Sequence, residues 1–133
     1  MEQLALLAKR KRTSAARLTK SSKIIKTIIA AIQDKKGENV ISMDLRKINE
    51  AVADFFIICE ATNPPQIKAI AENVQRKVNE KCDENPWHHE GYNRLQWVLL
   101  DYVNVVVHVM LPETRKFYKL EDMWSDAVSH EYE

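Results

Sequence analysis

Apolar residues recur along this chain at two spacings, one typical of helices and one typical of strands. The 3.6-residue spacing predicts a helix that is capped by Ser21 or Ser22 and ends at Gly37, which is expected at the C′ position. The same spacing predicts a second helix that opens at Pro64 and Pro65. The two apolar faces consist of Ile24, Ile25, Ile28, Ile29 and Ile32, and of Ile67, Ile70, Ala71, Val74 and Val78.

Short runs of β-branched and aliphatic residues predict strands at 40–45, 55–59, 97–100 and 105–110, and a further strand-like run follows Pro86. Val103 and Asn104 separate the last two runs and predict a hairpin, although a β-branched residue suits positive φ poorly. Pro112 starts a short helix through Tyr118, and residues 120–128 form another turn or two. This order predicts an α/β fold of the mixed α+β kind: a single domain with a mixed, about five-stranded sheet flanked by helices.

Composition narrows the class of protein. The chain has 133 residues, enough for one core, and no apolar run approaches the roughly 18–20 residues that cross a membrane. With only two glycines it has no glycine-rich loop to hold a phosphate. Cys59 and Cys82 match neither a metal pair nor a disulfide framework, so we expect a reducing, cytoplasmic location.

Charge is distributed unevenly. Residues 1–26 carry eight basic residues and one acidic residue, a net charge of +7, so the other 107 residues sum to −6. We therefore expect residues 1–20 to form a basic, flexible arm that contacts rRNA or another polyanion, and residues 21–133 to form the domain. A solubilising tail and, less readily, an organellar transit segment are the alternatives for the arm.

No set of side chains predicts catalysis. His88, His89 and His108 suggest a metal site, but neighbouring histidines of a strand point to opposite faces and the spacing does not complete a zinc set. Cys59 stands in an apolar run without a base, which favours a core position over a nucleophile. We therefore expect no metal, no cofactor and no enzyme activity.

The strand that begins at Trp97 offers the best candidate for binding. Alternation places Trp97, Leu99 and Asp101 on one face and the core residues Val98 and Leu100 on the other. An aromatic, an aliphatic and an acidic side chain together are typical of an interface centre that meets a basic partner. The alternative is a second buried face under a helix, with Asp101 capping a turn.

Four ordered segments resemble the ribosomal silencing factor family, also called the Iojap family, over roughly residues 22–128. The segments are Asp44-Leu45-Arg46; Ala53 to Cys59 with Ala61-Thr62-Asn63 and Gln66 to Ala71; Glu90-Gly91 with Trp97 to Tyr102 and Val105 to Val109; and Arg115 to Tyr118 with Leu120-Glu121, Trp124 and Asp126-Ala127. The chain departs from the family where Pro64-Pro65 replaces a more polar pair, Leu95 a common glycine, and Val103-Asn104 a common Gly-Asp.

The resemblance implies a cytosolic factor that binds the large ribosomal subunit through its fourteenth protein and blocks joining of the small subunit. It also implies a nucleotidyltransferase-like topology; such enzymes need a Gly-Ser turn and a D-x-D pair for magnesium. Neither pattern stands near Asp44, Asp54 or Asp101. Glu90 and Tyr118 are expected as rim contacts around Trp97. Left open are a homodimer off the ribosome and a different function, as an assembly factor or RNA-binding adaptor acting through the basic arm.

Overall fold

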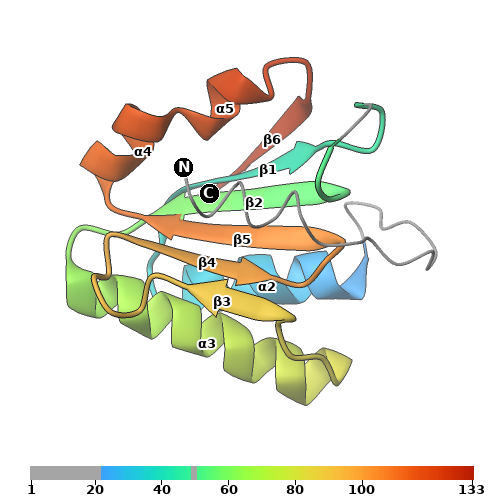
Figure 1. Ribbon diagram of the computed structural model, residues 1–133. Coiled ribbons are helices and arrows are strands. Elements are labelled where there is room, and N and C mark those ends of the chain that lie inside the picture. The colour runs from blue at the N-terminus through green and yellow to red at the C-terminus, as the bar shows by residue number, and fades with distance from the viewer. Residues whose placement is uncertain (1–21, 49–50) are drawn as a thin grey trace.

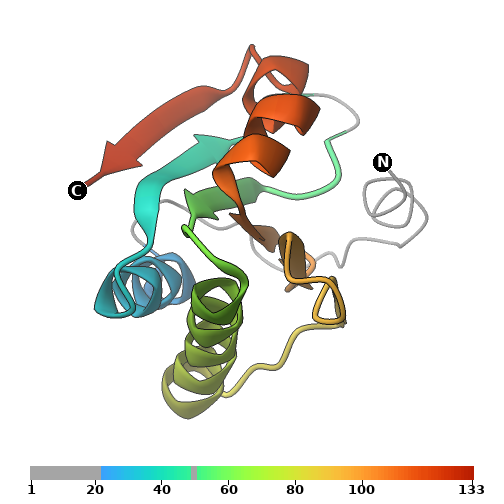
Figure 2. The ribbon, with the colours of Figure 1, turned by 90° about the vertical axis from the view of Figure 1, so that its left-hand side faces the viewer.

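A six-stranded mixed sheet lies between two layers of helices in the computed structural model, which describes residues 22–48 and 51–133 (Figure 1, Figure 2). Helices α2 (Lys23–Asp34) and α3 (Pro64–Cys82) cover one face, and α4 (Pro112–Tyr118) and α5 (Leu120–Met123) lie over the other. The strands are β1 (Glu38–Asp44), β2 (Phe55–Glu60), β3 (His88–Glu90), β4 (Trp97–Asp101), β5 (Val105–Met110) and β6 (Val128–Tyr132). They are arranged in the order β3-β4-β5-β2-β1-β6.

The centre of the sheet is the parallel pair of β2 and β5, whereas all other neighbouring strands are antiparallel. Every residue of β5 and all but the last of β2 are buried, because helices cover both faces at this point. The predicted fold class, a mixed sheet with flanking helices in one domain, is confirmed.

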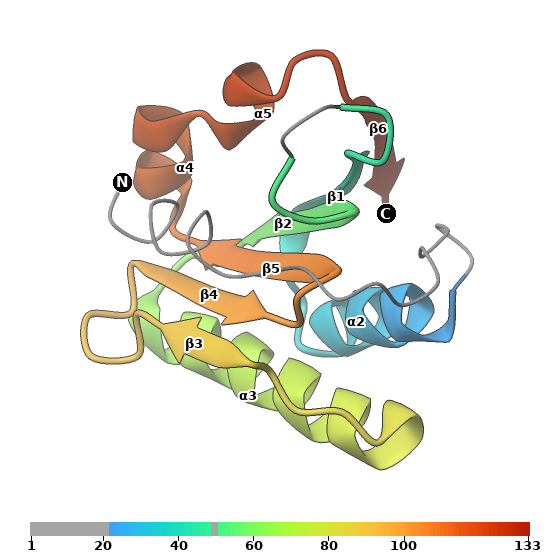
Figure 3. The same ribbon diagram turned by 45° about the vertical axis from the view of Figure 1, so that its right-hand side comes forward.

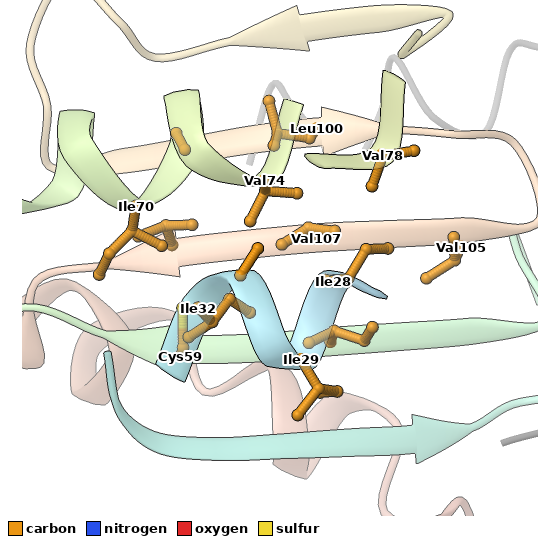
Figure 4. Packing of buried hydrophobic residues seen from close by; sticks show 14 of the residues in the cluster. Ile28, Ile29, Ile32, Cys59, Ile70, Val74, Val78, Leu100, Val105 and Val107 are labelled. Carbon is orange, nitrogen blue, oxygen red and sulfur yellow. The ribbon is translucent and has the colours of Figure 1, made fainter. Parts of the chain in front are cut away.

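Two hydrophobic clusters, one on each face, hold the layers together. Under α2 and α3, Figure 4 shows Val107 of β5 between Ile28 of α2 and Val74 of α3, with Ile32 of α2 beside Cys59 of β2. The isoleucines that share one face of α2 are all nearly inaccessible, as their spacing predicted.

Helix α2 ends one residue earlier than predicted. Lys36, with φ 62°, takes the left-handed C′ position expected for Gly37. The Lys36 N–H donates to the Gln33 carbonyl at 3.0 Å and the Gly37 N–H to the Ile32 carbonyl at 2.9 Å, which makes a Schellman motif with Gly37 at C″. Glycine is needed there for space, since a Cβ atom would overlap the Ile32 side chain.

Helix α3 begins where the sequence predicted. The Asn63 side-chain oxygen accepts a hydrogen bond from the Gln66 N–H at 2.9 Å, which satisfies one of the free donors of the first turn. Pro64 and Pro65 occupy the first positions, where no backbone donor is required. Asp83, with φ 54°, ends the helix in the left-handed conformation.

The sixth strand is the main difference from the predicted architecture. Residues 120–128 were expected to form helical turns, but α5 ends at Met123 and Val128 begins β6. This strand pairs antiparallel with β1, with Tyr132 opposite Val40 and the Tyr132 hydroxyl 3.0 Å from the Ser42 hydroxyl. The prediction of about five strands was therefore wrong by one.

Candidate partner-binding surface

Strand β4 has two distinct faces, as its alternating pattern predicted. Val98 and Leu100 join the cluster under α2 and α3, whereas Trp97 and Leu99 join the opposite cluster. Trp97 is 8% exposed, and Leu99 and Asp101 are fully buried. The second face is therefore buried, as the alternative interpretation held, because side chains of α4, α5 and the chain before β2 belong to the same packed cluster. Partner binding by these three residues remains a prediction.

The Trp97 side chain links the sheet to helix α4. Its indole N–H donates a hydrogen bond to Nδ1 of His108 on β5 at 3.1 Å. On its other side, the centroid of the Tyr118 ring lies 4.9 Å from that of the indole. A tryptophan that is hydrogen-bonded on one ring atom and packed against a tilted tyrosine ring has a fixed orientation.

His108, which faces Leu99 across the strand pair, accepts this hydrogen bond in its neutral form. Complete burial lowers the pKa of His108 to about 3, because the imidazolium would lose its hydration. With Nδ1 as acceptor, we assign the proton to Nε2, which has no hydrogen-bond partner among the described residues. The Phe56 ring lies edge-on to the imidazole, with centroids 4.6 Å apart. His108 is thus a packed structural residue.

Asp101 closes the hairpin between β4 and β5. Its Oδ1 atom accepts a hydrogen bond from the Val103 N–H at 2.8 Å, and the Tyr102 N–H donates to the Val105 carbonyl at 2.9 Å. Val103 has φ 72°, so a β-branched residue occupies the left-handed region. The predicted two-residue hairpin is confirmed, and Asp101 caps its turn as the alternative interpretation held.

Helix α4 presents two neighbouring aromatic residues in different settings. Tyr118 is half-buried against Trp97, whereas Phe117 is 71% exposed. Their rings contact each other edge to face, with centroids 5.0 Å apart. An exposed phenylalanine ring beside packed aromatic residues makes Phe117 a candidate for contact with a partner.

Arg115 fixes α4 against the rest of the domain. Its guanidinium donates to the Asn39 carbonyl at 2.7 Å and forms ion pairs with Glu60 of β2 at 3.1 Å and Glu121 of α5 at 3.3 Å. The Arg115 side chain is only 10% exposed, so these pairs are screened less than surface pairs. The aromatic residues of α4 are thereby held at a fixed position over the sheet.

Strand β3 forms the sheet edge beside β4. Glu90 lies opposite Leu99 in the register, and its Oε1 atom is 3.6 Å from Nε2 of His88. The next residue, Gly91, has φ 98°, and a Cβ atom there would overlap the Trp97 carbonyl oxygen. Only glycine therefore allows the chain after Glu90 to pass so close to the start of β4.

These contacts form one continuous region, which we name the α4–β4 surface. It comprises Phe117 and Tyr118 of α4, the buried Trp97 of β4, and Glu90 of β3. Figure 3 shows α4 above one end of β4 and β3 along its outer edge. The surface offers aromatic rings with a carboxylate beside them, which suits a partner that carries apolar and basic side chains.

The aspartates at strand ends have structural partners. Asp44 accepts hydrogen bonds from Arg46 at 2.6 and 2.9 Å, which lower the pKa of its carboxyl group. Among the described residues there is no group of three or more His, Cys, Asp or Glu that could hold a metal. Burial raises the pKa of the Cys59 thiol to about 12, so it stays protonated and unreactive.

No helix in the described part of the chain combines the length and the apolar character needed to cross a membrane.

Sequence reasoning missed three residues of this region. Phe117 and Arg115 were noticed only as parts of a family motif, and His108 only as part of a family motif and as a possible metal ligand. The signal for Phe117 was a pair of aromatic residues, Phe117 and Tyr118, between Lys116 and Lys119 at the end of a short helix. Arg115 and His108 gave no local signal, since their partners lie 55 and 11 residues away.

Comparison with known proteins identifies what the chain is similar to. Residues 18–133 match a protein family described as ribosomal silencing factor during starvation. The ribosomal silencing factor RsfS of Halalkalibacterium halodurans is 35% identical over 113 residues, which cover 85% of this chain and 95% of that protein. A crystal structure from Chromobacterium violaceum matches with a TM-score of 0.73 at 36% identity, covering 77% of this chain and 84% of that one.

A more distant relative carries a different name. The mouse protein called mitochondrial assembly of ribosomal large subunit protein 1 is 32% identical over 74 residues, which cover 54% of this chain and 32% of that protein.

Proposed function

This chain belongs to the ribosomal silencing factor family, and on that premise we propose that it binds the large ribosomal subunit through the fourteenth protein of that subunit. The bound protein occupies space that the small subunit needs, so translation is repressed by occupancy alone, in the cytoplasm and without chemical turnover. The observation that carries this proposal is the family similarity, which spans residues 18–133.

The α4–β4 surface supports the proposal because it supplies the chemistry of a docking site. Phe117 is the exposed anchor, and Tyr118 and Glu90 form its rim. Trp97, with Leu99 and Asp101 beside it, makes the floor that keeps the rim in place. In this arrangement the buried residues of β4 contribute to binding by their shape and rigidity, with a smaller share of direct contact.

The proposal is tested by sedimentation of the tagged protein with separated and joined ribosomes in sucrose gradients. We expect the protein to migrate with the large subunit and to reduce the peak of joined ribosomes when it is added before the small subunit. Migration with joined ribosomes at equal occupancy would exclude a steric block.

The docking surface is tested by Phe117→Ala. The loss of an exposed anchor should leave the thermal midpoint unchanged but weaken binding by about thirty-fold, which corresponds to roughly 2 kcal/mol. Binding is measured both to the large subunit and to its isolated fourteenth protein.

Val128→Ala is the matched control, because Val128 is 73% exposed and lies on β6, away from α4. This variant should bind like the unaltered protein. If both variants bind normally, the interface lies elsewhere on the molecule.

A second candidate function is assembly of the large subunit, which the name of the mouse relative favours. An assembly factor would act on immature particles, so deletion of its gene should cause precursors of the large subunit to accumulate during rapid growth. A silencing factor should instead change the ratio of free to joined subunits, with mature large particles.

A further inference from the structure

The layer formed by α2 and α3 differs in charge from the rest of the domain. Residues 23–36 and 64–82, which contain the two helices, carry eight basic and three acidic residues, a net charge of +5. Residues 37–63 and 83–133 carry six basic and fifteen acidic residues, a net charge of −9. Figure 2 shows this helical layer on the opposite side of the sheet from α4 and α5. Charge is therefore distributed unevenly over the domain: the face made by α2 and α3 is basic, and the rest of the domain is acidic.

The cations of this face are mostly lysines, and nearly all of them are exposed. They are Lys23, Lys26, Lys35 and Lys36 in and after α2, and Lys68, Lys77 and Lys81 in α3. None of the seven forms an ion pair with a described residue. Arg76 is the exception, because it pairs with Glu80 one turn further along α3.

A shallow groove runs between the two helices at the centre of this face. Its walls are the small side chains of Thr27, Ala30 and Ala31 on α2, with Lys77 and Lys81 on α3, and its volume is about 210 Å³. The carboxylate of Asp34 stands at one end, 3.3 Å from the amide of Asn73. Small residues beside two lysines leave room for an anionic group to approach the helix backbones.

The residue types on this face distinguish nucleic acid from protein as the occupant. Protein interfaces are depleted in lysine and enriched in aromatic residues and arginine. The large exposed hydrophobic residues in the described chain are Trp87, Phe117, Met123 and Val128, and none of them lies on α2 or α3. Flexible lysines without aromatic neighbours suit a row of phosphates, which bind by charge and not by base stacking.

We propose that the face made by α2 and α3, with Lys77 and Lys81 at the groove and Lys26 exposed on α2, binds the phosphate backbone of RNA. This second contact is separate from the α4–β4 surface and lies across the sheet from it. The proposal rests on the proposed function in one respect: a protein bound to the large ribosomal subunit would find this phosphate backbone in ribosomal RNA. The contact reads charge and spacing, not sequence, because lysines that meet phosphates carry no base information.

The test compares two triple variants of the full chain that remove the same amount of charge. The first is Lys26→Gln, Lys77→Gln and Lys81→Gln on the helical face. The second is Lys47→Gln, Arg94→Gln and Lys116→Gln, three exposed cations outside the helical layer. Each is titrated against a fluorescent RNA duplex of about 20 base pairs, at several salt concentrations chosen to reveal counterion release.

The helical-face variant should bind the duplex on the order of tenfold more weakly at 0.1 M salt. Its slope of log affinity against log salt should fall by about 2 to 3, because three phosphate contacts are lost. The second variant should keep most of the affinity and the slope. A variant with arginine at positions 26, 77 and 81 keeps the positive charge, so it should bind RNA like the unaltered protein. Normal binding by this variant would show that substitution at these three positions does not by itself unfold the domain.

Equal losses in the two triple variants would overturn the inference, because binding would then depend on net charge or on residues 1–20. Unchanged RNA binding in both variants would overturn it as well. If the helical-face substitutions weakened binding to an acidic protein and left RNA binding unchanged, the face would be assigned to a protein partner. These results are independent of sedimentation with the large subunit, which tests the proposed function by itself.

Discussion

Val103 shows how a single residue can be held in an unfavourable conformation by its surroundings. It has φ 72°, and its N–H is fixed by the Asp101 carboxylate at 2.8 Å. A left-handed conformation costs an L-residue roughly 1–2 kcal/mol, and a β-branched side chain suits it least. The pairing of β4 with β5 imposes the hairpin, because it stabilises the fold by more than the strain at Val103 destabilises it.

Val103→Gly should therefore stabilise the protein. The strain relief exceeds the entropic penalty of glycine, so we expect a gain of about 0.5–1 kcal/mol and a rise of a few degrees in the thermal midpoint. Asn104→Gly is the control, since Asn104 shares the turn but lies outside the positive-φ region. A gain in the control alone, or a loss in Val103→Gly, would contradict this account of the turn.

His108 predicts a pH dependence of stability. Its pKa is lowered to about 3 in the fold, whereas an unfolded histidine has a pKa of about 6.5. The unfolded state therefore takes up the proton first as the pH falls, and the stability that is complete above pH 6.5 declines toward pH 3. From pH 7.5 to pH 5, urea unfolding should show a loss of about 2 kcal/mol from this residue.

The comparison is between His108→Phe and His89→Gln. Phenylalanine cannot be protonated, so the first variant should lack this part of the decline, although it loses the acceptor for the Trp97 indole. His89 is exposed, and its replacement should leave the pH profile unchanged. Parallel profiles for His108→Phe and the unaltered protein would show that some other group causes the acid sensitivity.

At the scale of elements, the start of α3 offers a direct measure of a helix cap. Asn63→Ala removes the acceptor of the Gln66 N–H and should reduce the free energy of unfolding by about 1 kcal/mol. Asn63→Ser should recover most of that loss, because a serine hydroxyl caps nearly as well. Chemical unfolding of the three proteins decides the point, and equal stabilities would mean that water replaces the cap.

The elements that bury a periodic apolar face were predictable from the sequence, and β6 was not. Regularly spaced or consecutive isoleucine, valine and leucine residues predicted helices α2 and α3 and strands β2, β4 and β5. Strand β6 consists of V-S-H-E-Y, and all but its last residue are exposed. Its strand conformation comes from hydrogen bonding to β1, a contact across almost the whole domain that no local pattern reveals.

At the scale of the whole molecule, the same limit applies to the candidate surface. The alternation in β4 correctly separated Trp97, Leu99 and Asp101 from the core under α2 and α3. It could not show that α4 and α5 help to pack the second face, because that depends on where the chain goes after β5. Residues 1–20, which were expected to form a basic arm, lie outside the described residues, and their contact with RNA stays a prediction.

The pairing of β6 with β1 has a consequence for the way the chain is made. Val40 pairs with Tyr132, so β1 leaves the ribosome long before the strand that will cover its outer edge. At 5–20 residues per second, synthesis of the intervening chain takes roughly 5–20 seconds. During that interval the nascent sheet can bury its centre, yet one edge keeps unsatisfied backbone donors and acceptors that only water or another chain can meet. The outer edge of β1 is consequently covered only after β6 has been synthesised and has left the ribosome.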